Sequence, residues 1–110
     1  MREEQIIVTG ASKGIGQAIA RELDARGYRV VGLSRSGESG VGRAIACDMT
    51  DEGAVKAAFA QIAQEGPIAG LVNNAGVHIA GPIATLSVAE FEKTMALNAT
   101  AVMVAAREVY

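Results

Sequence analysis

The stretch TGASKGIG, residues 9–16, directly follows an apolar run at residues 6–8 and carries three glycines, at positions 10, 14 and 16. Gly10 permits a tight turn after a strand, while Gly14 and Gly16 stand where a helix begins. The free N–H groups and positive end of such a helix can bind a pyrophosphate. The stretch is not a P-loop, because Gly14 is followed by Ile15 and Gly16 and not by lysine and a hydroxyl residue. It predicts a dinucleotide site; the alternative is a turn leading into a glycine-tolerant helix.

The apolar pattern predicts strands alternating with helices in a single domain over residues 1–110. Strands are expected at residues 5–9, 28–34, 43–47 and 68–72. Helices are expected at residues 14–26, from an N-cap at Asp51 to about Gln64, and from a capping box of Ser87 and Glu90 to the end of the sequence. Buried strands joined by crossover helices indicate an α/β protein with a parallel sheet and right-handed connections.

Composition excludes several classes of function. The net charge is -2, without a basic stripe, which argues against nucleic acid as a partner. Apolar stretches are broken well before the length of about 18 residues that a membrane span requires. One cysteine and one histidine make a protein-held metal site very unfavourable, so no metal ligands are predicted. Without a secretory leader or a cysteine pair, a cytoplasmic location is expected.

The end of the second expected strand bears on the choice of cofactor. In dinucleotide folds an acid there binds the 2′-hydroxyl of NAD, whereas a base accepts the 2′-phosphate of NADP. Ser34, Arg35 and Ser36 occupy this place, with no acid before Glu38, and Lys13 at the helix start can reach the same phosphate. These residues predict that NADP(H) is favoured over NAD(H). The alternative is that Arg35 and Lys13 are ordinary solvated charges.

Four motifs together resemble the short-chain dehydrogenase/reductase family, whose fold is a Rossmann-type sheet. They are TGASKGIG at residues 9–16, Asp48 within CDMTD, NNAG at residues 73–76 and Asn98 within MALNAT. They occur in the family's order and cover the whole chain. The resemblance implies a doubly wound parallel sheet in the strand order 3-2-1-4, with helices on both faces. It also implies an oxidoreductase that acts on a small-molecule carbonyl or alcohol.

The resemblance also implies a role for each matched position. The pyrophosphate loop would comprise Gly10, Ser12, Gly14, Ile15 and Gly16; the adenine would meet Asp48 and Met49; and the turn beside the ribose would comprise Asn74, Ala75 and Gly76. Asn98 is similar to the helix-borne asparagine that helps to hold a water in the family's proton relay. The alternatives are a turn or N-cap aspartate at Asp48, and a purely local hydrogen bond at Asn98.

The sequence departs from the family pattern in two ways. The connection at residues 35–42 is too short for the helix that the family places there, so one face of the sheet should be thinner. The family's serine and Tyr-x-x-x-Lys motif would fall beyond Tyr110, so these 110 residues alone are expected to be inactive. They should also expose the edge of the fourth strand and part of the last helix, through which homo-oligomers are expected to pair.

Four further residues are assigned no chemistry. Cys47 is expected to pack in the core, His78 to be solvated in a loop, and Met95 and Met103 to pack along the last helix.

Three functions compete on the sequence. The favoured one is an NADP(H)-dependent oxidoreductase, to which this chain contributes the cofactor-binding half. The alternatives are a non-catalytic dinucleotide-binding module for redox sensing or scaffolding, and a structural remnant that associates through its exposed edge.

Overall fold

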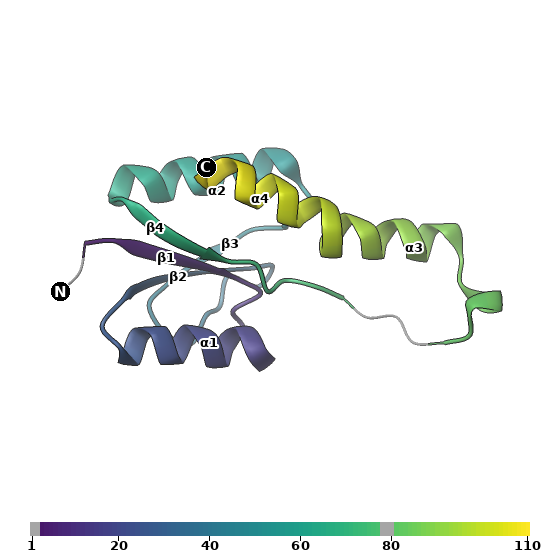
Figure 1. Ribbon diagram of the computed structural model, residues 1–110, viewed down its shortest axis with the longest axis horizontal. Helices are drawn as coiled ribbons and strands as arrows, with labels where there is room; N and C mark the ends of the chain where they lie inside the picture. Colours follow the sequence, from purple (N-terminus) through teal and green to yellow (C-terminus); the bar gives the residue numbers. More distant parts are fainter. Residues whose placement is uncertain (1–2, 78–80) are drawn as a thin grey trace.

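A computed structural model describes residues 3–77 and 81–110 (Figure 1). The strands are β1 (Gln5–Thr9), β2 (Arg29–Ser34), β3 (Arg43–Ala46) and β4 (Ile68–Val72). The helices are α1 (Gly14–Ala25), α2 (Glu52–Glu65), α3 (Val88–Met95) and α4 (Ala101–Val109), with a 3-10 turn η1 (Ile83–Thr85) and a π-helical turn η2 (Ala96–Thr100). The four expected strands and the first two expected helices are present, with bounds that match the expectation or differ from it by one residue.

The strands form one parallel sheet in the order β3-β2-β1-β4, which confirms the predicted topology. Ile7 in the central strand β1 lies beside Val31 of β2 and Leu71 of β4. Both β1 and β2 are almost entirely buried, as expected of strands covered on both faces. Within the described residues β3 and β4 are the two edges of the sheet.

Helices cover the two faces of the sheet unequally. Helix α1 lies on one face, and α2 and α4 lie on the other (Figure 1). The larger core cluster, around Ile7, Leu33 and Phe59, includes residues of both α2 and α4. The smaller cluster, which includes Val8 and Ala20, lies on the α1 face. The expectation of a thinner face is therefore confirmed.

Local signals explain where the helices begin and end. Asp51 caps α2 by accepting a hydrogen bond from Ala54 N at 3.1 Å. Ser87 and Glu90 form the predicted capping box at the start of α3. Gly27 follows α1 with φ of +88°, a conformation that ends helices and suits glycine.

The last helical segment differs from the single helix that the sequence predicts. It is interrupted by η2, and α3 extends beyond the edge of the sheet (Figure 1). Met95 is 44% exposed and Met103 is 52% exposed, so the prediction that they pack is wrong. No residue of α3 is buried, because no strand or helix among the described residues lies beneath it. Cys47 is buried in the core as predicted, whereas His78 lies outside the described residues.

Candidate dinucleotide-binding site

The predicted site residues come together at the carboxyl edge of the sheet. The loops after β1, β2, β3 and β4 all leave from this edge, because the four strands are parallel. The connection after β1 leads toward β2, whereas β4 lies on the other side of β1. Such a change of direction creates the crevice in which open α/β sheets bind ligands.

The turn between β1 and α1 is fixed by contacts that only glycine allows. Gly10 has φ of +67°, and its N–H donates to Leu33 O at 2.8 Å. A Cβ on Gly16 would lie 2.1 Å from Gly10 O and 2.3 Å from Asn74 Nδ2. Gly16 therefore lets α1 pack directly on the turn. Gly14, with φ of +59°, faces open space, since no atom outside its own stretch of chain lies within 4 Å of the place that a Cβ would take.

The first turn of α1 has the features of an anion site. Its N-cap, Lys13, makes no side-chain capping bond in the described structure, and the first turn holds no acidic residue. The first N–H groups of the helix and its positive dipole end are thus not neutralised by side chains there. The carbonyl of Ser12 accepts a hydrogen bond from Gln17 Nε2 at 3.3 Å. Ile15, in the first turn of α1, is 74% exposed.

Thr9 ties the loops after β1 and β4 together, a role that the sequence did not reveal. Its buried hydroxyl oxygen accepts hydrogen bonds from Asn74 N and Ala75 N, both at 3.0 Å, and can donate to Val72 O at 3.5 Å. Asn74 Nδ2 adds a bond to Gly10 O at 3.1 Å. A threonine at the end of a buried strand was the available signal, but its partners lie more than 60 residues away.

Asn98 lies in the π-helical turn η2 and binds the backbone that follows β4. Its Oδ1 accepts from Val77 N and its Nδ2 donates to Val77 O, each at 2.8 Å. Gly76 fits closely beside it, since an added Cβ would lie 3.2 Å from Asn98 Oδ1. The amide retains one further acceptor position and one further N–H. A role for Asn98 in a proton relay stays a prediction.

Asp48 and Met49 point in different directions. Asp48 is exposed, and its Oδ1 accepts from Thr50 Oγ1 at 2.6 Å and from Thr50 N at 2.9 Å. These bonds, with a smaller contribution from the charge of Arg35, lower the pKa of Asp48. The side chain of Met49 is buried in the core, so only its backbone can contact a ligand. Burial, reinforced by Asp48 and Asp51, raises the pKa of the Cys47 thiol.

The residues after β2 divide into buried and exposed ones. Ser34 is only 6% exposed, and its hydroxyl is occupied by hydrogen bonds to the backbone of Glu38. Arg35 and Ser36 are exposed, as is Lys13 at the start of α1. The structure thus presents two cations and one hydroxyl at the carboxyl edge, and it turns Ser34 away from direct contact with a ligand.

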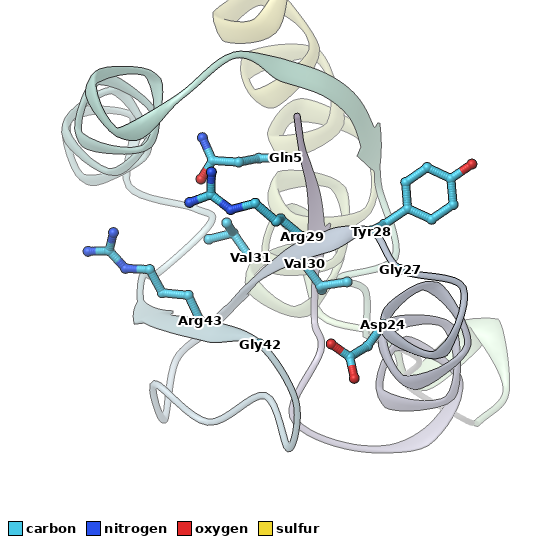
Figure 2. A pocket seen from close by; sticks show the side chains of 9 residues that line it. All are labelled: Gln5, Asp24, Gly27, Tyr28, Arg29, Val30, Val31, Gly42 and Arg43. Carbon is cyan, nitrogen blue, oxygen red and sulfur yellow. The ribbon is translucent and has the colours of Figure 1, made fainter. Parts of the chain in front are cut away.

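A hollow of about 460 Å³ lies at the opposite, amino edge of the sheet (Figure 2). Gln5, Arg29 and Arg43 line it at the starts of β1, β2 and β3. Gln5 Nε2 is committed to Ile62 O and Gly66 O, both at 2.9 Å, and Arg43 forms an ion pair with Glu65. The side chains of Gln5 and Arg43 in this hollow thus make contacts within the fold, and none of the predicted site residues lines it.

A model of the short chain dehydrogenase family matches residues 4–110. The chain belongs to this family. The chain is similar to D-threitol dehydrogenase of Mycolicibacterium smegmatis, with 37% identity over an alignment of 105 positions that covers 84% of this chain and 40% of that protein. The chain thus spans well under half the length of that relative.

Solved structures of the short-chain dehydrogenase type share the fold closely. Aldohexose dehydrogenase of Thermoplasma acidophilum matches with a TM-score of 0.90 and 37% identity, over 98% of this chain and 43% of that chain. A metagenomic short-chain oxidoreductase in complex with NADP matches with a TM-score of 0.87 and 36% identity, over 96% of this chain and 54% of that chain. These matches confirm the predicted Rossmann-type fold. Among the described residues, no helix is long and apolar enough to cross a membrane.

Proposed function

We propose that this chain forms the NADP(H)-binding part of an oxidoreductase that acts on a small carbonyl or alcohol substrate. The observation that carries the proposal is the first turn of α1, which is uncapped by side chains, free of acids and placed at the carboxyl edge of the sheet. Bound NADP(H) would supply or accept the hydride. The chain's own residues would bind and orient the cofactor.

Each loop of the site has a part in holding the cofactor under this proposal. The backbone N–H groups at Gly14 and Ile15 would face the pyrophosphate. Asp48 would accept from the adenine amino group, since it is exposed and its hydrogen bonds within the described residues, both to Thr50, use only Oδ1. The turn Asn74, Ala75 and Gly76, which Thr9 holds against β1, would lie beside the ribose.

The preference for NADP(H) is supported by the charges around the end of β2. Arg35 and Lys13 are both exposed, and no acid stands between Ser34 and Glu38. The similar metagenomic oxidoreductase was solved in complex with NADP. The serine and Tyr-x-x-x-Lys of the family pattern do not occur at the expected spacing within these 110 residues, so we expect the chain alone to bind cofactor without turnover.

Titration with NADPH and NADH tests the proposal. We expect NADPH to bind more tightly, and Arg35→Ala and Lys13→Ala each to weaken NADPH by about tenfold, the value of one charge-assisted contact, with little change for NADH. Arg21→Ala, at an exposed position later in α1, is the control and should change neither affinity. Tighter binding of NADH, or equal effects of the Arg35 and Arg21 variants, would contradict the NADP(H) assignment.

Self-association and a cytoplasmic location also belong to the proposal. Val88, Phe91, Met95 and Met103 expose apolar surface on α3 and α4, and β4 is an open edge among the described residues. Such surface is usually covered in the working protein. Light scattering would show whether copies of the full chain pair, and cell fractionation would test the location.

A further inference from the structure

The connection between β2 and β3 is a loop where a doubly wound sheet would usually carry a helix. Residues 35–42, all of them described, form no helix and lie against the α1 face of the sheet. Ser39 is buried over Gly32, where an added Cβ would lie 2.3 Å from Ser39 Oγ. Val41 packs against the smaller core cluster. The loop thus covers part of the sheet that a helix would otherwise shield.

The hydroxyl of Ser34 closes the first turn of this loop. Ser34 Oγ donates to Glu38 O at 2.9 Å and accepts from Glu38 N at 3.1 Å. Ser36 Oγ lies 3.3 Å from both Glu38 N and Ser34 Oγ. The backbone of Ser34 is equally fixed, since its carbonyl accepts from Cys47 N at 2.8 Å and from Gly37 N at 3.3 Å. Through its carbonyl Ser34 is thus bound to Cys47, just after β3, and through its hydroxyl to Glu38, within the loop.

The two exposed residues inside this closed turn are Arg35 and Ser36. Their neighbours in sequence, Ser34 and Gly37, are held by the hydrogen bonds of the turn. A loop with three glycines at positive φ, at positions 37, 40 and 42, has many alternative conformations without such bonds. Binding a phosphate through a mobile loop costs the free energy of ordering it, so a closed turn improves affinity by preorganisation.

We infer that Ser34 is a positioning residue for cofactor specificity, whose hydroxyl closes the turn 34–38 so that Arg35 and Ser36 face the 2′-phosphate. The inference rests on the proposed NADP(H) function and extends it. It assigns the cofactor specificity to the hydrogen bonds between Ser34 and Glu38, which order a loop that has no helix of its own. Ser34 itself makes no contact with the cofactor. Its loss should weaken binding of the cofactor that carries the 2′-phosphate far more than binding of the one that lacks it.

The test is the ratio of NADPH to NADH affinity in the full chain. Ser34→Ala is expected to weaken the binding of NADPH by about tenfold and the binding of NADH by less than about threefold. Ser39→Ala is the matched control, because it removes a buried hydroxyl of the same loop that bonds Val41 O at 2.8 Å. It should leave the ratio unchanged. Ser34→Cys, which keeps the volume but is a poor hydrogen-bonding group, serves as a second variant if Ser34→Ala does not fold.

The outcomes separate the inference from the function on which it rests. If the wild type prefers NADPH and both Ser34 variants keep its ratio, the positioning role is overturned while the proposed function stands. Equal loss of both cofactors in the Ser34 variants, or the same shift in Ser39→Ala, would also overturn it, since both indicate general damage to the loop. A wild type that prefers NADH or binds neither cofactor would overturn the inference and the cofactor assignment together.

Discussion

The side chain of Asn98 binds both backbone groups of Val77, with each hydrogen bond 2.8 Å long. Asn98 lies in the π-helical turn that interrupts the last helical segment, and Val77 follows the NNAG turn after β4. Turns of this type are often found at functional sites. The amide thus sets the distance between the helix and the loop that would lie beside the cofactor ribose.

Asn98→Ala should destabilise the fold by about 1–2 kcal/mol, because two hydrogen bonds are lost and water can partly replace them at this exposed position. Urea denaturation measures the change. Gln61→Ala, which removes an exposed amide from α2, is the control and should change stability by less than about 0.5 kcal/mol. Equal effects of the two substitutions would show that the pair with Val77 contributes nothing.

Gly16→Ala should lower the free energy of unfolding by about 1–3 kcal/mol and abolish cofactor binding. The reason is that the alanine Cβ would overlap Gly10 O and Asn74 Nδ2. Gly53→Ala provides the comparison. Gly53 lies within α2, where the nearest atom to an added Cβ is 3.5 Å away, so alanine should stabilise that helix by about 0.5–1 kcal/mol. Thermal unfolding measures both effects: the melting temperature should fall in Gly16→Ala and rise in Gly53→Ala. A folded Gly16→Ala protein with normal binding would contradict the close packing of α1 on the turn.

Thr9→Val keeps the shape of the side chain but leaves the N–H groups of Asn74 and Ala75 without their acceptor. We expect a loss of about 1 kcal/mol or more in stability, because both donors are partly buried and an unsatisfied donor there costs part of its desolvation. Thr9→Ser retains the hydroxyl and should lose less. Hydrogen exchange at the amides of Asn74 and Ala75 checks the cause directly: both should exchange faster in Thr9→Val, and unchanged rates would argue against the tie.

Asp48 should contribute stability that depends on pH. Its pKa is lower in the folded state than its usual value near 4 because the hydroxyl and N–H of Thr50 bind its carboxylate. Its contribution is therefore present above the unfolded pKa and is lost as the pH falls through the lower folded pKa.

Thr50→Val should raise the pKa of Asp48 toward its usual value, which carbon NMR titration of the carboxyl group can follow. Thr85→Val, which removes a hydroxyl bonded to Pro82 O at 2.9 Å, is the control and should leave that pKa unchanged. An unaltered pKa in Thr50→Val would mean that the hydroxyl bond does not set it.

Much of the fold was readable from local sequence. The glycine turn, the capping residues Asp51 and Ser87, and the alternation of apolar strands with amphipathic helices each have a short-range physical cause. General rules for strands joined by crossovers predicted a parallel sheet with right-handed connections, and the resemblance to the family supplied the strand order. The prediction that Met95 and Met103 pack was wrong because packing is not a local property. Helical periodicity shows which residues share a face, but not whether anything covers that face.

The sequence by itself determined the elements, their order and the residues gathered at the carboxyl edge. The tertiary structure alone decided which of these residues are held and by what: Thr9 binds backbone 65 and 66 positions away, Asn98 binds Val77 across 21 positions, and Ser34 is turned inward by its own loop. The bonds of Thr9 and Asn98 leave no local signature, because each side chain meets its partner only after folding has brought distant segments together. The bond of Ser34 is local, but the sequence does not show whether the hydroxyl turns to its own loop or to a ligand.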